Sequence, residues 1–121
     1  MAAVSYDRWL HELWNGEPDR LESVARGVVS PGFVGTWPGR PGLVHGPEEL
    51  AAVIRQGREM FDELRFEVEV GPITQGDLTA ARWLARGVHQ GAACEFRGHD
   101  LLRSGPEGFT EYWVLAEDPT G

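Results

Sequence analysis

The feature of this sequence that most constrains its fold is a change in hydrophobic period close to Leu64. Before this residue, apolar side chains recur every three or four positions, which is typical of helices that bury one face. After it, apolar and charged residues alternate from Phe66 to Val70, as expected for a strand with one wet face. Helices followed by a run of antiparallel strands predict an α+β fold with the helices on one side of the sheet.

Three helices are predicted. The first covers residues 5–15, with Ser5 as its N-cap and apolar side chains at helical spacing. The second covers residues 18–25, and the third begins at Pro47, a residue favoured in the first turn of a helix. The Gly- and Pro-rich segment 38–46 is expected to form a loop. Strands are expected in four segments, which are residues 33–37, 66–70, 78–90 and the two arms of a hairpin over 96–113.

The hairpin predicted over residues 96–113 carries the main candidate for a functional residue, Asp100. Successive strand side chains point to opposite faces, so Asp100 shares an apolar face with Phe96 and Leu102, opposite the face that bears the arginines. A carboxylate on an apolar face must find a partner, hold a proton or line a cavity. We therefore expect the rest of the chain to form a pocket around Asp100.

The composition narrows the classes of partner. At 121 residues, we expect one domain over residues 1–121 with a core of about 6–118. Eleven arginines, no lysine and nineteen acidic residues give a net charge of −8, which argues against nucleic acid and anionic membranes as partners. The absence of lysine excludes Schiff-base catalysis. The arginine-rich composition is typical of a gene of high G+C content, so we expect a bacterial protein.

Other features bear on location and cofactors. Cys94 is the single cysteine, which excludes an internal disulfide and predicts a reducing, cytoplasmic location. We expect neither a secretion signal nor a membrane span, because no apolar stretch is long enough. The four histidines lack metal-ligand spacing, and the sequence has no nucleophile motif or phosphate-binding loop. We therefore expect no metal and no cofactor.

Several short segments occur in an order that is characteristic of a known family. They are Arg8-Trp9 with Trp14-Asn15-Gly16, Phe61 to Arg65, Gly76-Asp77 with Arg82-Trp83, Gly87 to Gly91, Gly98 to Arg103, and Glu111-Tyr112-Trp113. In this series the chain resembles the SnoaL-like polyketide cyclases, which belong to the cone-shaped α+β superfamily named after nuclear transport factor 2. The resemblance implies a curved, cystatin-like antiparallel sheet with three N-terminal helices that enclose a pocket.

The chain also departs from the family pattern. Residues 61–64 read Phe-Asp-Glu-Leu where the family has Phe-Pro-Asp-Leu, and the extension before the hairpin is cut to residues 92–95. Because that extension forms part of the pocket rim in relatives, we expect a smaller or more open mouth. Trp9 and Trp37 stand where the related steroid isomerases have their catalytic tyrosine and aspartate, and the triad of the epoxide hydrolases is missing.

The resemblance gives Asp100 the role of general acid and base in an intramolecular aldol closure, a role that needs a pKa raised by an apolar wall. The residues alone leave open a structural carboxylate paired with Arg82 or Arg86. His89 is expected near Asp100, where it positions the acid or relays a proton, and the alternative is a histidine of the core or rim.

The remaining candidates line or border the pocket. Five aromatic residues are expected to contact a ligand, although such residues more often form core: Trp9, Phe33, Trp37, Trp83 and Trp113. Glu111 shares the predicted strand face of Trp113 and is interpreted as a second pocket acid or as a structural partner of Arg103. His45 is expected to gate the mouth of the pocket. Tyr6 is expected to anchor at the surface, with a hydrogen bond to an enolate as the alternative.

Two functions follow. The first is a cofactor-independent cyclase or isomerase that uses acid/base catalysis on a small apolar carbonyl compound of polyketide type. The alternative is a non-catalytic domain of the same fold that binds a small apolar or aromatic molecule or forms dimers. A homodimer is expected through the outer face of the sheet, with Arg97, Arg103 and Tyr112 in the contact.

Overall fold

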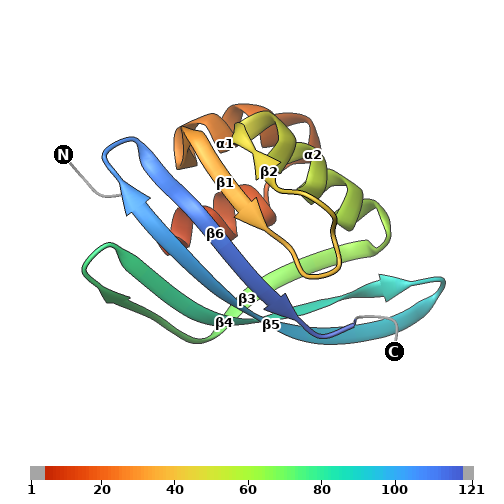
Figure 1. Ribbon diagram of the computed structural model, residues 1–121. Helices are drawn as coiled ribbons and strands as arrows, with labels where there is room; N and C mark the ends of the chain where they lie inside the picture. The colour runs from red at the N-terminus through yellow and green to blue at the C-terminus, as the bar shows by residue number, and fades with distance from the viewer. Residues whose placement is uncertain (1–4, 119–121) are drawn as a thin grey trace.

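The computed structural model describes residues 5–118, and Figure 1 shows its elements. In chain order the bounds are η1 (Arg8–Trp14), η2 (Pro18–Arg20), α1 (Leu21–Val28), β1 (Val29–Thr36), β2 (Val44–His45), α2 (Gly46–Glu59), β3 (Asp62–Gln75), β4 (Leu78–His89), β5 (Ala92–Gly105) and β6 (Gly108–Ala116). None of the helices within residues 5–118 is long and apolar enough to cross a membrane.

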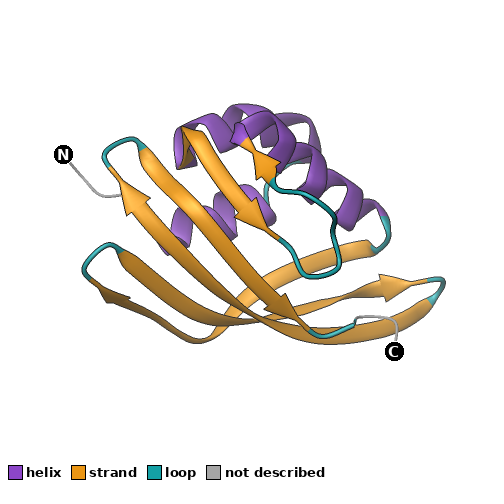
Figure 2. Ribbon diagram, viewed as in Figure 1, coloured by secondary structure: helices purple, strands orange, loops and turns teal. Residues whose placement is uncertain are grey.

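The six strands form one sheet in the order β2-β1-β6-β5-β4-β3. The sheet curves beneath the helices, which lie on one of its faces (Figures 1 and 2). This arrangement confirms the predicted α+β fold. One detail of the prediction is wrong, because β1 and β6 run parallel whereas all other neighbouring strands are antiparallel. No hairpin joins β1 to β6, so a turn does not fix their relative direction.

The first helix begins where it was predicted. The hydroxyl oxygen of Ser5 accepts the N–H of Arg8 at 3.2 Å, which confirms Ser5 as the N-cap. The helix then widens into a π-helical segment, in which the N–H of Asn15 reaches the carbonyl of Leu10 at 2.9 Å. The Asn15 amide pairs with the backbone N–H and C=O of Phe66 at 2.8 and 2.7 Å, which fastens the end of η1 to β3.

The second helix is longer than predicted, and the third is confirmed. α1 continues to Val28, past the predicted end at Ala25. A glycine such as Gly27 costs about 1 kcal/mol in a helix. However, Val28 is fully buried, and burying a valine side chain contributes about 1.5 kcal/mol or more. α2 carries Pro47 in its first turn, as predicted.

The alternation predicted along β5 is confirmed. Phe96, Asp100 and Leu102 are all buried on the helix side of the sheet. The strand begins earlier than expected, because a tight turn at Gln90 and Gly91 replaces the predicted link. Both residues have positive φ (50° and 81°), which allows a two-residue hairpin connection.

The faces predicted for β6 are reversed. Tyr112 is buried on the helix side, whereas Glu111 and Trp113 lie on the outer face. The cause is a β-bulge opposite Ser104. Arg103 of β5 pairs with Glu111 of β6, but the next residue, Ser104, pairs with Phe109. Thr110 is left without a partner, and the alternation of side chains reverses after it. The local sequence pattern contains no sign of this bulge.

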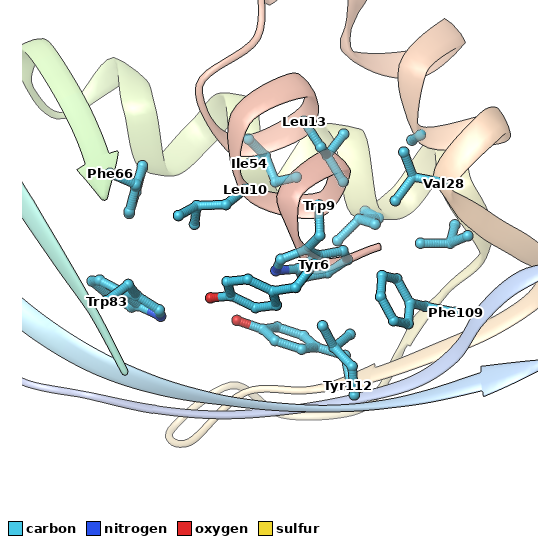
Figure 3. Packing of buried hydrophobic residues seen from close by; sticks show 14 of the residues in the cluster. Tyr6, Trp9, Leu10, Leu13, Val28, Ile54, Phe66, Trp83, Phe109 and Tyr112 are labelled. Carbon is cyan, nitrogen blue, oxygen red and sulfur yellow. The ribbon is translucent and has the colours of Figure 1, made fainter. Parts of the chain in front are cut away.

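The hydrophobic core fills the space between the helices and the concave face of the sheet (Figure 3). Its largest fully buried side chains include four rings, those of Trp9, Phe33, Phe109 and Tyr112. The Trp9 ring contacts the other three, with centroid distances of 4.7 Å to Tyr112, 5.8 Å to Phe109 and 6.3 Å to Phe33. This aromatic cluster places η1 directly above β6.

Candidate functional site

The carboxyl group of Asp100 lies inside this core, and the residue is only 3% exposed. The hydroxyls of Tyr6 and Tyr112 donate hydrogen bonds to Oδ2 and Oδ1, each at 2.7 Å. The indole Nε1 of Trp9 donates to Oδ2 at 3.2 Å, and that of Trp83 donates to Oδ1 at 2.9 Å. A carboxylate offers about four acceptor positions. These four donors therefore occupy the whole group.

Three elements supply the four donors. Tyr6 and Trp9 are three residues apart in the first helix and so share one helical face. Trp83 on β4 and Tyr112 on β6 each lie two residues from the direct strand partner of Asp100, on the same face of the sheet. Figure 3 shows the two tyrosine hydroxyls close together, with the Trp83 nitrogen turned toward them.

Burial dominates the electrostatics of the site. It raises the pKa of the Asp100 carboxyl above the usual range, although the hydrogen bonds from Tyr112, Tyr6, Trp83 and Trp9 oppose the shift. Burial and the nearby Asp100 charge also raise the pKa of both tyrosines far above its ordinary value, so both phenols keep their protons. No cation in residues 5–118 forms an ion pair with Asp100. The alternative interpretation, a structural pairing of Asp100 with Arg82 or Arg86, is wrong, because these arginines bind glutamates on the outer face.

A cavity of about 280 Å³ adjoins Asp100. Ligand sites for drug-sized molecules usually span about 300–1,000 Å³, so this cavity suits a smaller ligand. The side chains in its wall that carry polar atoms are those of Trp14, Trp37, Arg58, Trp83, Asp100 and Tyr112. The other wall residues with side chains are apolar, namely Leu10, Pro38, Met60, Phe61, Leu64, Phe66, Phe96, Val114 and Ala116.

The two oxygens of Asp100 differ in their surroundings. The donors to Oδ1, Trp83 and Tyr112, are part of the cavity wall. The donors to Oδ2, Tyr6 and Trp9, belong to the core and do not line the cavity. A ligand in the cavity therefore approaches Asp100 from the side of Oδ1.

The predicted aromatic lining is divided among three places. Trp37 and Trp83 lie in the cavity wall, and their contact with a ligand stays a prediction. Trp9 and Phe33 are fully buried in the core and do not line this cavity. Trp113 lies on the outer face of the sheet, where its ring centroid is 6.0 Å from an arginine guanidinium carbon. The placement predicted for these last three residues is therefore wrong.

Two more candidates lie away from the cavity. Glu111 is on the outer face and accepts a hydrogen bond from Arg103 at 2.8 Å, which matches the structural alternative rather than a pocket acid. His45 is an exposed residue of β2 and borders a separate hollow beside the N-terminal end of α2. Its predicted place at the mouth of the Asp100 cavity is wrong.

His89 does not lie near Asp100. The strand register places it opposite Ala92, near the other end of β5 and about 26 Å along the strand from Asp100 at the usual rise of about 3.3 Å per residue. The ring of His89 packs against Phe61 at 5.5 Å, and Nδ1 is 2.9 Å from the carbonyl oxygen of Met60. The prediction that His89 assists Asp100 directly is therefore wrong. Within residues 5–118, no group of three or more His, Cys, Asp or Glu side chains is arranged to hold a metal ion.

Three residues of the site were missed from the sequence. Tyr6 is buried rather than at the surface, and its spacing of three from Trp9 placed it on the apolar face of the helix. Tyr112 was assigned to the outer face because the bulge in β6 has no sequence signal. Arg58 lines the cavity from α2. Nothing in the helical pattern distinguished it from a solvated arginine.

Comparison with known proteins places this geometry in a family. The sequence profile of the SnoaL-like domain matches residues 6–112. No curated protein sequence matches the chain. Similar solved structures include a proposed SnoaL-like polyketide cyclase from Jannaschia sp. CCS1, with 19% identity, a TM-score of 0.76 and coverage of 93% of this chain and 84% of the other.

Two further structures agree in fold. One is a proposed isomerase of the SnoaL-like family from Agrobacterium tumefaciens, with 18% identity, a TM-score of 0.77 and coverage of 93% of this chain and 94% of the other. The other, from Catenulispora acidiphila, has a ketosteroid isomerase-like fold and is in complex with trimethylamine. It shows 15% identity and a TM-score of 0.75, and the match covers 91% of this chain and 82% of the other. At such identities the likeness concerns the fold, whereas the profile match covers most of the sequence. This chain therefore belongs to the SnoaL-like domain family.

Proposed function

We propose that this protein is a cofactor-independent cyclase or isomerase that moves a proton on a small apolar carbonyl compound, with Asp100 as the general acid and base. The observation that carries the proposal is a buried carboxyl group beside a largely apolar cavity, bound by neutral donors and, within residues 5–118, by no cation. The raised pKa brings the Asp100 carboxyl closer to the working pH, where it both accepts and returns a proton.

The proposed reaction needs no outside oxidant, reductant or metal. The Asp100 carboxylate takes a proton from the carbon next to a carbonyl, and the C–H electron pair passes into an enolate. In a cyclisation the enolate carbon then forms a bond to a second carbonyl carbon of the same molecule. The oxygen of that second carbonyl receives the displaced electron pair and takes the proton back from Asp100. An isomerisation differs only in that the proton returns to a different carbon.

Oδ1 is the proposed site of proton transfer, because its two donors line the cavity. A proton can reach Oδ1 when the Tyr112 hydroxyl turns its hydrogen toward the substrate oxygen. The same movement offers a hydrogen bond to the enolate as its charge develops. Oδ2 stays fixed by Tyr6 and Trp9, which hold the carboxyl group in place.

The test uses proton exchange, since it does not require the natural substrate. β-Tetralone is incubated with the protein in D2O, and deuterium uptake next to its carbonyl is followed by proton NMR. The Asp100→Asn variant, checked for folding by circular dichroism, is expected to lower the exchange rate roughly a hundredfold. Tyr112→Phe should reduce the rate more than Tyr6→Phe, although both remove a 2.7 Å hydrogen bond to Asp100. Exchange at the buffer rate with the folded native protein contradicts the proposal.

A second candidate function, a non-catalytic domain that binds a small molecule, is favoured by one specific observation. Donors occupy all the acceptor positions of Asp100, an arrangement that also suits a purely structural anchor. In that case β-tetralone binds, but the protein does not accelerate its deuterium exchange above the rate in buffer. Tyr6→Phe and Tyr112→Phe then lower the stability of the protein by similar amounts and leave this exchange rate unchanged.

We also propose a homodimer through the outer face of the sheet. One row of paired residues across the strands is apolar, formed by Ile73, Ala80, Leu101 and Trp113. The ion pair of Arg103 with Asp77 borders this row and offers both signs of charge to a second copy of the chain. The predicted part of Tyr112 in this contact is wrong, because its side chain is buried.

The dimer is tested by sedimentation at micromolar concentration. The native protein should sediment as a dimer, and Leu101→Glu should sediment as a monomer with an unchanged circular dichroism spectrum, because a charge then sits in the apolar row. Leu43→Glu is a suitable control, because Leu43 is an exposed leucine in the loop before β2. A native protein of 13.4 kDa at all concentrations contradicts the dimer.

A further inference from the structure

Arg58 is an arginine of the cavity wall without a carboxylate partner. It lies near the end of α2, and its guanidinium donates a hydrogen bond to the carbonyl oxygen of Gly16. No acidic side chain within residues 5–118 forms an ion pair with it, although the chain carries nineteen acidic residues. A backbone carbonyl engages only part of a group with five N–H donors. Arg58 therefore has hydrogen-bonding capacity and charge to offer to a ligand.

The electrostatic surroundings favour an anion at this part of the wall. Partial burial lowers the pKa of Arg58, and the positive charge of Arg65 lowers it further. Glu17 opposes these effects in part, but it forms no ion pair with Arg58 within the described chain. A guanidinium remains charged at any ordinary pH. Among residues 5–118, Glu17 offsets this positive charge only in part.

Trp14 provides a second donor in the same wall. Its Nε1 is buried and has no hydrogen-bond partner within residues 5–118. A buried donor without an acceptor costs about 1–3 kcal/mol, which a ligand oxygen can recover. Trp14 is two residues from Gly16, the residue that Arg58 contacts, and its ring packs on Phe66 at 5.4 Å.

This polar end is separated from Asp100 by an aromatic side chain. The Phe66 ring contacts both Trp14 and Trp83, at centroid distances of 5.4 and 5.3 Å. Trp83 in turn donates to Asp100. The cavity wall therefore combines an acid/base group, aromatic rings and a cation, linked by these contacts. A ligand that matches all three has a carbonyl at one end, a ring between, and an anion at the other.

We propose that Arg58 determines the ligand class, and that among small carbonyl compounds with an apolar ring the cavity selects an aromatic or alicyclic carboxylate over its neutral analogue. The carboxylate binds the Arg58 guanidinium, with Trp14 as a further donor, while the ring packs against Phe66. This inference rests on the proposed function in so far as that function makes the cavity the ligand site. It concerns binding alone and does not require Asp100 to move a proton.

The test compares two probes of nearly the same shape, β-naphthoate and methyl β-naphthyl ketone, by isothermal titration calorimetry near neutral pH. The native protein should bind the carboxylate about tenfold more tightly than the ketone, the size expected for one charge-assisted hydrogen bond. Added salt should reduce this preference, because salt screens the interaction at a partly exposed charge. Arg58→Gln should remove the preference, and Arg58→Lys, which keeps the charge, should restore part of it.

Arg55 provides a matched control. It lies one helical turn before Arg58 on α2 and also donates to a backbone carbonyl, that of Pro18 at the start of η2, at 2.9 Å, but it does not line the cavity. Arg55→Gln should therefore keep the preference for the carboxylate.

The outcomes separate this inference from the proposed function. Equal affinity of the native protein for both probes, binding of neither probe, or a preference that persists in Arg58→Gln would overturn the role of Arg58. Preferential binding of the carboxylate without any proton exchange on β-tetralone would leave the role of Arg58 intact and reject the catalytic function.

Discussion

On the helix side of β5, the carboxylate of Asp100 is bound by two phenols and two indoles, whereas on the outer side of the same strand carboxylates are bound by arginines. Glu69 forms ion pairs with Arg82 at 2.7 Å and with Arg97 at 3.1 Å, and all three side chains are partly exposed. Water solvates the charges of the outer face.

The difference shows how burial selects the partner of a carboxylate. A guanidinium beside Asp100 would have to lose its own hydration, a cost that often exceeds the gain from the ion pair. A phenol or indole supplies a hydrogen bond without a second buried charge. It also leaves the carboxyl group able to change its protonation state, which a neighbouring cation would suppress. The inner arrangement is thus compatible with acid/base chemistry, and the outer one is not.

The largest expected effect comes from removing the inner acceptor. Asp100→Asn replaces one carboxylate oxygen with an NH2 group and leaves two buried donors without an acceptor. The free energy of unfolding should fall by about 3 kcal/mol or more, measured by urea denaturation. Asp77→Asn, which breaks the exposed ion pair with Arg103, should have a much smaller effect. Equal losses in the two variants would mean that burial does not distinguish the two faces.

Next in size is the effect of Gly98→Ala. A Cβ at Gly98 would lie 2.1 Å from the indole of Trp83, so the ring must move away from its position beside Asp100. We expect a loss of about 2 kcal/mol in the free energy of unfolding, typical of overpacking in a core. Gly32→Ala is the control, since a Cβ there meets no atom within 4 Å. A stable Gly98→Ala variant with unchanged tryptophan fluorescence would show that the contact is not close.

A smaller loss is expected for each phenol. Tyr6→Phe and Tyr112→Phe each remove one hydrogen bond to Asp100 and should lower the free energy of unfolding by about 1–2 kcal/mol. Because both hydroxyls bind the same carboxylate, the loss in the double variant should differ from the sum of the two single losses. Strict additivity in urea denaturation would argue that the two phenols act independently.

The smallest effects concern pH, and their signs are opposite on the two faces. The pKa of Asp100 is raised in the folded state, so its contribution to stability is present below the unfolded pKa of about 3.9 and is lost as pH rises through the higher folded value. Partial burial raises the pKa of Glu69, but Arg97 and Arg82 together lower it further than burial raises it. Its contribution is therefore present above the unfolded pKa and is lost as pH falls through the lower folded value.

These signs are measured as the difference in unfolding free energy between the native protein and each variant from about pH 4 to pH 8. With Asp100→Asn the difference should decrease as pH rises. With Glu69→Gln it should increase as pH rises from the acidic end. If the two free-energy differences changed in the same direction with pH, the proposed contrast between the buried and the outer carboxylates would be contradicted.

Much of the fold could be predicted because it depends on local patterns. The helical repeat gave η1 and α2, and strict alternation placed Asp100 on the buried side of β5. Errors arose where a distant contact overrides the local pattern. The parallel pairing of β1 with β6 and the bulge opposite Ser104 both depend on strands that are far apart or out of register. The reversed faces of Tyr112 and Trp113 follow from that bulge.

The site shows the same division. The sequence by itself determined that an acid lies on an apolar strand face and that the chain has enough aromatic residues to surround it. Only the tertiary structure decided which residues surround it, because the donors to Asp100 come from the first helix, β4 and β6 and are up to 94 residues away along the chain. It also decided that His89 lies elsewhere and that Arg58 lines the cavity. Side-chain alternation is a property of each strand, whereas the meeting of side chains from different elements depends on how those elements pack.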